Sequence, residues 1–483
     1  MFVHKILNFL LPEILMIAFA SCTLLLGAFF QCLRMRMCQI GIVFFLALLG
    51  IYFLEDTVFI LNDVEGGFVL DTIAIFGKIL ILLCATGLLV VSLGYFRNNR
   101  AILFNEYFFL FTMSVVGAML IVSSSNFLSL YISLELSSLV LYMLVCYNKC
   151  KSSIDAGMKY FVSGALMSGV MLYGISLVYG ATGSLDYSVI LGANAIHGTM
   201  LLPMVGMVCI ISAMLFKLAS FPFHMWLPDV YEGALPPVAG FVAVIPKIAC
   251  AIALYRILLF VFPAYVDQWR TLLVILAILS MLFGSVLAVV QDKVWRMLAY
   301  SSVTHAGYII LAIASATQNM VGALFLYLAV YVVTILSVFA ILSGIYINDR
   351  RVIYTDELSG LHNKFPVMAA CLAVALFSMA GVPPLFGFFA KYLVFHAAME
   401  SGLFISVISG VISSIISAFI YLKVIRNMYF ASIGVGNNMM ASHSLLMRLL
   451  ILCISLLLAI LWFPFFGYSD YVIQLASDVM VLS

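Results

Sequence analysis

Long apolar segments follow one another along almost the whole chain, with short polar connections between them. Each segment is close to the roughly 20 residues that an α-helix needs to cross the hydrocarbon layer of a bilayer. The segments lack the strict alternation of barrel strands and are about twice as long, which excludes a membrane β-barrel. The pattern predicts an all-α polytopic membrane protein with fourteen spans, over residues 10–31, 37–54, 71–95, 107–123, 126–147, 157–180, 201–220, 236–262, 271–290, 298–315, 321–346, 365–398, 402–422 and 446–468.

Composition supports a lipid bilayer as the surroundings of the chain. Of its 483 residues, 66% are hydrophobic and 9% are charged, and the mean hydropathy is +1.23. Soluble domains do not reach these values. The net charge of +2 leaves no broad basic surface for nucleic acid. The 10 cysteines stand singly in apolar runs, without the spacing of a metal site, so no metal is expected.

Lysine and arginine fall in alternate loops, and this distribution predicts the orientation of the chain. Basic loop residues are retained on the cytoplasmic side. That side then holds Arg34, Arg36, Arg97, Arg100, Lys149, Lys151, Lys159, Lys293, Arg296, Arg350, Arg351, Lys364, Lys423, Arg426 and Arg448. Both termini are expected on the opposite side. The apolar stretch after Lys5 has no small-residue cleavage site, so we expect it to remain as the first span.

One cytoplasmic loop departs from this rule. The connection between the seventh and eighth spans has no lysine or arginine and carries Asp229 and Glu232 instead. The chain also lacks a Walker loop, a dinucleotide-binding glycine motif and a Ser/His/Asp arrangement on a strand-to-helix turn. Any chemistry is therefore expected inside the membrane, on the few ionisable residues that the spans contain.

Glu135 is the most deeply placed carboxylate in these spans. It is the tenth residue of the span over 126–147, too far from either end for its side chain to reach water. Tyr131, Ser138 and Tyr142 lie on the same helical face and form a narrow polar stripe with it. A charge at this depth normally faces the protein interior and marks a pathway, although a structural role is the alternative.

Lys217 stands just before a predicted break in the seventh span. Pro222 removes a helix hydrogen bond and clashes with the preceding turn, so the helix should end after the lysine. Broken helices at membrane depth are found where they line a cavity. His224 lies beyond the break and is a candidate for the same site, whereas a proline kink alone carries no function.

Two further lysines lie well inside their spans. Lys247 is near the middle of the eighth span, with Gly240, Ala243, Cys250 and Ala251 on its own face, where small residues leave room for a neighbouring helix or water. Lys391 follows a second break, at Pro383 and Pro384. The lysine precedes the first break and follows the second, which is the order that an inverted repeat produces.

Buried lysines near a carboxylate are suited to proton exchange. Burial disfavours the charged form and a nearby carboxylate favours it, so a row of such lysines forms a proton relay. His305 is a further candidate, with a hydrogen-bonded structural histidine as the equal alternative. Lys78 and Glu13 are weaker candidates, because both lie within two or three turns of a span end and could snorkel to the interface.

Several segments resemble the antiporter-like membrane subunits of respiratory complex I, and most closely the subunit N type. They are YISLELSSLVLYML, KYFVSGALMSGVMLYGISLVYGATGSL, FKLASFPFHMWLPDVYEGALPPV, KVWRMLAYSSVTHAGY and GVPPLFGFFAKY, and the resemblance covers almost the whole chain. One departure is the loop EGALPPV, where a threonine–proline pair would be usual. Lysine rather than glutamate at 391 favours the N and L types over the M type.

The resemblance implies two inverted five-helix repeats, over 107–262 and 263–427, with broken helices at spans 7 and 12. Residues 1–106 then form three preceding spans, and 428–483 hold the last one. It also implies that Glu135 and Lys217 form a charge-switching pair, that Lys247 is the central relay lysine and that Lys391 is the terminal one. The location would be the bacterial inner membrane, with both termini periplasmic.

The resemblance further implies where the redox chemistry takes place. FMN, iron–sulfur clusters and quinone would be bound by partner subunits, and no cofactor is expected in this chain. Its partners would be the other antiporter-like and small membrane subunits of the complex. A multisubunit cation/proton antiporter remains the alternative, since it shares the repeat and the lysines. The third hypothesis is that the chain is a structural spacer, whose buried charges only fix helix packing.

Overall fold

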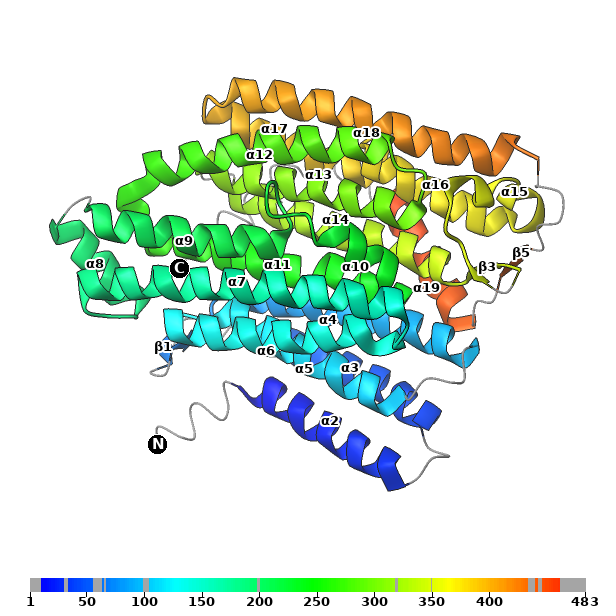
Figure 1. Cartoon of the computed structure of the whole chain (residues 1–483), viewed down its shortest axis with the longest axis horizontal. Coiled ribbons are helices and arrows are strands. Elements are labelled where there is room, and N and C mark those ends of the chain that lie inside the picture. Colours follow the sequence, from blue (N-terminus) through cyan, green and yellow to red (C-terminus); the bar gives the residue numbers. More distant parts are fainter. Residues whose placement is uncertain are drawn as a thin grey trace.

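Long helices lying side by side make up most of the molecule (Figure 1). The computed structural model describes residues 10–29, 34–54, 63–64, 67–98, 104–197, 200–317, 320–348, 350–432, 439–441 and 445–460. The long helices are α2 (Leu11–Phe29), α3 (Arg34–Leu54), α4 (Thr72–Asn98), α5 (Phe104–Ser123), α6 (Phe127–Val145), α7 (Lys151–Thr182), α9 (Leu201–Leu218), α11 (Pro236–Phe260), α12 (Val266–Val289), α13 (Val294–Ser315), α14 (Met320–Ser343), α18 (Phe404–Phe430) and α19 (Leu445–Ile460).

Shorter elements connect these helices or divide them. The twelfth predicted span is two half-helices, α16 (Pro366–Ala380) and α17 (Phe386–Glu400). The remaining short elements are α8 (Tyr187–His197), α10 (Leu227–Gly233), α15 (Leu361–Lys364), the 3-10 turns Cys146–Asn148, Pro263–Tyr265 and Thr355–Leu358, and the strands β1 (Asp63–Val64), β2 (Phe68–Val69), β3 (Ile345–Ile347), β4 (Arg350–Arg351) and β5 (Met439–Ala441). β1 pairs with β2, and β3 pairs with both β4 and β5, all antiparallel.

The all-α polytopic class is confirmed. Eleven of the described helices are long and apolar enough to cross a membrane. The other three predicted spans correspond to α3, the α16–α17 pair and α19, whose apolar stretches are shorter. The predicted end of the last span, at 468, and both chain termini lie outside the described residues.

Three helices form the centre of the bundle. The apolar window of α11 is 100% buried, and those of α13 and α14 are nearly so, whereas α2, α7, α12 and α18 expose one side. Small residues let the helices approach closely. A Cβ added to Gly174 of α7 would lie 2.7 Å from the carbonyl oxygen of Gly206 in α9. Lys247 therefore stands on a helix that has no lipid-facing side.

The two broken spans end their first halves in the same way. Ala219 and Gly381 adopt left-handed backbone conformations, with φ of +56° and +80°. The next residue in each case, Ser220 or Val382, donates its N–H to the carbonyl four positions before the cap, on Leu215 or Phe377. This cap satisfies carbonyls that the broken helix would leave unpaired in the membrane.

Candidate functional site

Lys247 is surrounded by hydroxyl groups in the centre of the bundle. Its Nζ donates to Ser302 Oγ at 2.5 Å and to the Ser302 carbonyl oxygen at 2.9 Å. Ser302 Oγ also lies 2.9 Å from the Tyr331 hydroxyl and 3.1 Å from the Tyr231 hydroxyl. Helices α10, α11, α13 and α14 thus each contribute one group. Among the described residues no carboxylate contacts Lys247, so the lysine is held by neutral groups alone.

Lys391 lies at the second break. Its Nζ donates to the carbonyl oxygen of Ala380, the last residue of α16, at 2.9 Å. The same Nζ is 5.1 Å from the centre of the Tyr308 ring, a cation–π contact. The C-terminal end of a helix carries partial negative charge, so this position stabilises an ammonium.

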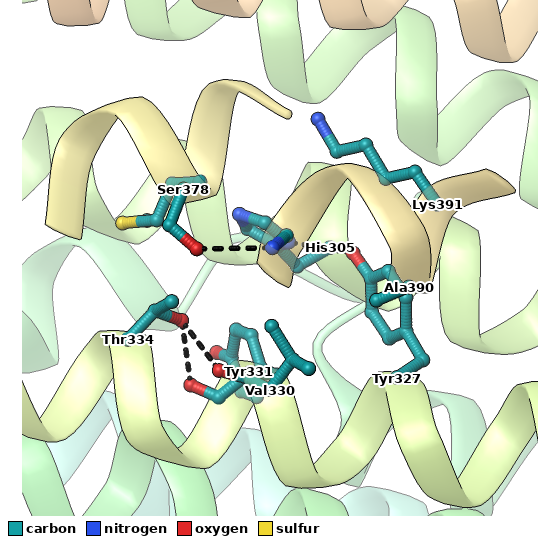
Figure 2. Close-up of a pocket in the computed structure, with 10 residues that line it drawn as sticks. His305, Tyr327, Val330, Tyr331, Thr334, Ser378, Ala390 and Lys391 are labelled. Atoms are coloured by element: carbon teal, nitrogen blue, oxygen red, sulfur yellow. Dashed lines mark hydrogen bonds between the residues drawn. The ribbon is translucent and has the colours of Figure 1, made fainter. Parts of the chain in front are cut away.

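A small cavity joins the surroundings of Lys391 to those of Lys247. Its volume is about 10 Å³, which is near the lower limit for one water molecule. Figure 2 shows the polar side chains around it, His305, Tyr327, Tyr331, Thr334, Ser378 and Lys391. His305 Nδ1 is 2.6 Å from the Tyr327 hydroxyl, and Tyr331 is the neighbour of Ser302 on the other side. The structure therefore brings His305 between the two lysines.

Lys217 has the same kind of surroundings as Lys247. Its Nζ donates to Ser138 Oγ at 2.5 Å and to the Tyr142 hydroxyl at 3.4 Å. Both partners belong to the polar stripe that the sequence places on α6. A second cavity of about 10 Å³ is bounded by Ser138 and Lys217 on one side and by Pro246 and Cys250 of α11 on the other. It leads from Lys217 to the helix that carries Lys247.

Glu135 is half-buried and accepts a hydrogen bond from Ser168 of α7. Ser168 also contacts the Tyr131 hydroxyl, at 3.3 Å. Glu135 and Lys217 form no ion pair within 4.0 Å in the described part of the chain. Ser138, one turn from Glu135 on α6, binds the lysine. The ammonium thus binds α6 one helical turn away from the carboxylate, and the two groups are not contact partners.

His224 does not join this row by direct contact. It lies in the turn between α9 and α10, where it stacks on Phe221 with ring centres 5.7 Å apart and meets the edge of Tyr300 at 6.1 Å. The side chain is buried, and its Nδ1 has no hydrogen-bond partner in the described part of the structure.

Snorkelling, considered from the sequence for Glu13 and Lys78, is wrong. Their side chains are 2% and 0% exposed, and Lys78 Nζ lies 2.7 Å from Glu13 Oε1. The distance of each residue from its span end suggests that its side chain reaches the membrane interface, but the packing of α2 and α4 keeps both side chains buried. The presence of one acidic and one basic residue in two separate spans was the sequence feature that could have predicted this ion pair.

The acidic loop that carries Asp229 and Glu232 has no basic residue of its own and forms ion pairs with basic residues of neighbouring elements. Asp229 pairs with Lys159 at 2.5 Å and with Arg296 at 2.6 Å. Glu232 pairs with Arg296 and, at 2.5 Å, with Lys293. Although burial acts to raise the pKa of Glu232, these hydrogen bonds and charges hold it below the ordinary value. The contacts also place the basic residues of two connections at the same end of the bundle as the acidic loop, as the loop pattern predicts.

Several residues of the site could not be found from the sequence. Ser302, Tyr331, Tyr327, Tyr231 and Ser378 are ordinary hydroxyl-bearing residues in apolar helices, and only packing brings them to the lysines. In the described residues no cluster of histidine, cysteine, aspartate or glutamate could hold a metal ion.

Comparison with known proteins gives consistent similarities. The sequence model of the NADH:quinone oxidoreductase/Mrp antiporter transmembrane family matches residues 124–417. NADH-quinone oxidoreductase subunit N of Rhodospirillum rubrum is 40% identical over 89% of each chain, and that of Parvibaculum lavamentivorans is 38% identical over 87% of each. A chain in the structure of respiratory complex I from Thermus thermophilus is 28% identical, with a TM-score of 0.80 over 96% of this chain and 98% of that one.

Proposed function

The chain belongs to the NADH:quinone oxidoreductase/Mrp antiporter membrane-subunit family, and on that premise we propose that it translocates protons as the N-type membrane-arm subunit of NADH–quinone oxidoreductase. The observation that carries this proposal is the row of three lysines, Lys217, Lys247 and Lys391, each held inside the membrane by hydroxyl or carbonyl oxygens. An ammonium with neutral partners can release its proton without leaving a buried carboxylate unpaired.

Each lysine has a defined role in the proposed relay. Glu135 and Lys217 form the charge-switching pair, and Ser138, which binds the lysine one turn away from Glu135 on α6, mediates between them together with the α6 stripe. Lys247 is the central exchange site, where its proton can pass to Ser302 Oγ while the Ser302 hydroxyl proton moves to Tyr331. The Tyr331 hydroxyl proton moves on at the same time to a water molecule in the cavity that Tyr331 and His305 line, and Lys247 is left as a neutral amine. Lys391 is the terminal site. His305, paired with Tyr327, assists transfer across the cavity, and His224 is an auxiliary group near the first break.

The remaining assignments follow from the family. FMN, iron–sulfur clusters and quinone would be bound by partner subunits, and this chain would contribute translocation alone. Its partners would be the other antiporter-like and small membrane subunits of the complex. The chain would lie in the bacterial inner membrane with both termini periplasmic. We further infer inverted repeats over 107–262 and 263–427, flanked by 1–106 and 428–483, and the matching caps at Ala219 and Gly381 support this division.

Proton flux measured with the purified complex in proteoliposomes tests this function. Glu135→Gln and Lys217→Ala are expected to lose proton uptake, whereas Lys364→Ala, at an exposed lysine, should keep it. Unchanged pumping and unchanged NADH–quinone turnover in both relay variants would overturn the proposed roles. Co-purification separates the function from that of a multisubunit cation/proton antiporter, because only the former predicts that NADH- and quinone-binding subunits accompany this chain.

A further inference from the structure

The Glu13–Lys78 pair is a buried charge site that the relay does not use. It joins α2 to α4 and lies outside residues 124–417, which the family's sequence model matches. Lys78 Nζ and Glu13 Oε1 are 2.7 Å apart, and both side chains are closed off from the surface. The second oxygen, Glu13 Oε2, is buried without a hydrogen-bond partner in the described part of the chain.

The pair is at the depth of the relay rather than at the membrane surface. Helices α4 and α11 run in opposite directions: a Cβ added to Gly77 would lie 2.7 Å from Ile252 Cδ1, and one added to Gly240 would lie 3.1 Å from Leu88 Cδ2. Lys78 is therefore level with Ala251. Along the axis of α11 that level is about 6 Å, or one turn, from Lys247.

A gain in stability does not by itself account for a charged pair at this depth. Removing two charges from water costs several kcal/mol per ion, and a buried pair is often no more stable than apolar residues of the same volume. Ionisable groups at membrane depth commonly serve transport. Glu13 Oε2 also has no hydrogen-bond partner in the described part of the chain and can bind a proton. An ion pair that only holds α2 against α4 does not require such an oxygen.

Among the residues that the structure describes, few other charges face the pair. Asp71, which directly precedes α4 and lies seven residues before Lys78, is paired with Arg256 of α11 at 2.8 Å. Lys247 is the other charged residue on α11. α14, which also packs against α4, has no charged residue. The charged residues of α3, α5 and α19 stand in their first turns, at the opposite end of α4: Arg34, Arg36, Glu106 and Arg448.

We propose that Glu13 and Lys78 form an additional proton-exchange site in the helices that precede the relay. The inference rests on the proposed function in proton translocation. In this site the Glu13 carboxylate binds one proton at Oε2 and becomes a carboxylic acid, while Lys78 stays an ammonium. The charge of the pair changes from zero to plus one, and release of the same proton to water or to a neighbouring proton carrier restores it.

The test uses the intact complex in proteoliposomes, with proton uptake measured per NADH oxidised. The double variant Glu13→Leu/Lys78→Met replaces the pair with apolar side chains and should keep assembly and thermal stability. We expect it to lose part of the proton uptake. Wild-type uptake in this variant would overturn the proposal and leave the pair a structural clamp.

Two further measurements complete the experiment. Infrared difference spectra of the intact complex on a pH change should show a carboxylic acid band that Glu13→Gln abolishes, and absence of that band in the wild type would also overturn the proposal. This readout decides the question if the double variant fails to assemble. Lys247→Met, measured in parallel, separates the two hypotheses: unchanged uptake there refutes the relay, whereas loss there with wild-type uptake in the double variant refutes only the additional site.

Discussion

Lys391 reaches back across the break in its own span and donates a hydrogen bond to the carbonyl oxygen of Ala380, the last residue of α16, at 2.9 Å. Lys217 belongs to the last turn of its own first half-helix, α9. The two lysines stand on opposite sides of their breaks in the sequence, yet each is associated with the end of the first half-helix. Partial negative charge at such an end stabilises an ammonium by about 0.3–1 kcal/mol in exposed helices and more when partly buried.

Lys391→Arg separates charge from proton exchange. Arginine keeps the positive charge at the end of α16 but does not release a proton in proteins. We expect this variant to assemble and to lose most of its proton uptake, whereas a lysine that only stabilised the break would tolerate the change. Proton flux and the thermal stability of the complex are the measurements. Normal flux with normal stability would contradict a relay role for Lys391.

Gly381→Ala should disturb the same site through the backbone. Gly381 has a φ of +80°, and an added Cβ would lie 2.9 Å from Lys391 Cδ. The left-handed conformation costs an alanine roughly 1–2 kcal/mol, and the contact forces the lysine aside. We predict reduced proton flux together with a lower melting temperature. Gly402→Ala, which also has positive φ but no neighbour within 4 Å of the added Cβ, should lower only the melting temperature.

Ser302→Ala removes the hydroxyl that connects Lys247 to Tyr331. A buried donor left unsatisfied costs about 1–3 kcal/mol, and Nζ would keep only the Ser302 carbonyl. Slower proton translocation is expected, with recovery in Ser302→Thr because threonine retains a hydroxyl. The measurement is the rate of proton uptake in each variant and in the wild type. A wild-type rate in Ser302→Ala would show that the Ser302 hydroxyl is not on the path.

The sequence was sufficient to predict the spans and to locate Glu135 and the three lysines within them, but not to predict the contacts of these residues. Apolar length defines a membrane helix, and depth within a span marks a residue such as Lys247 as unable to reach water. The partners of Lys247 depend on helix rotation and packing, which hydropathy does not encode. For the same reason the sequence does not single out Ser302 among the many serines of the spans. The contact between Glu13 and Lys78 cannot be predicted either when each residue is considered only within its own span.

Glu232→Gln should weaken the connection between α10 and the start of α13. Because the folded pKa of Glu232 is lowered, its stabilising contribution is present above the unfolded value of about 4.5 and is lost as the pH falls through the folded value. Its partners Lys293 and Arg296 are about one-third exposed, so we expect a loss of only about 1 kcal/mol. Melting temperatures of variant and wild type should differ at pH 7 and converge in acid below pH 4.5; a difference that persists there would exclude the ion pairs as its cause.

Cys250→Met tests whether the cavity between Lys217 and α11 carries protons. Cys250 lines this cavity and is not one of the hydrogen-bond partners of Lys217 or Lys247 in the described part of the chain, so a larger side chain there fills the space without removing a titrating group or its partner. Overpacking costs about 1–3 kcal/mol, and that cost alone could lower activity. Cys371→Met is the matched control, because Cys371 is also buried but lies beside Ser455, away from the lysines. We expect both variants to lower the melting temperature and only Cys250→Met to slow proton uptake. Equal uptake in the two variants would mean that protons do not cross this cavity, and transfer between Lys217 and Lys247 would then require movement of the lysine side chains themselves.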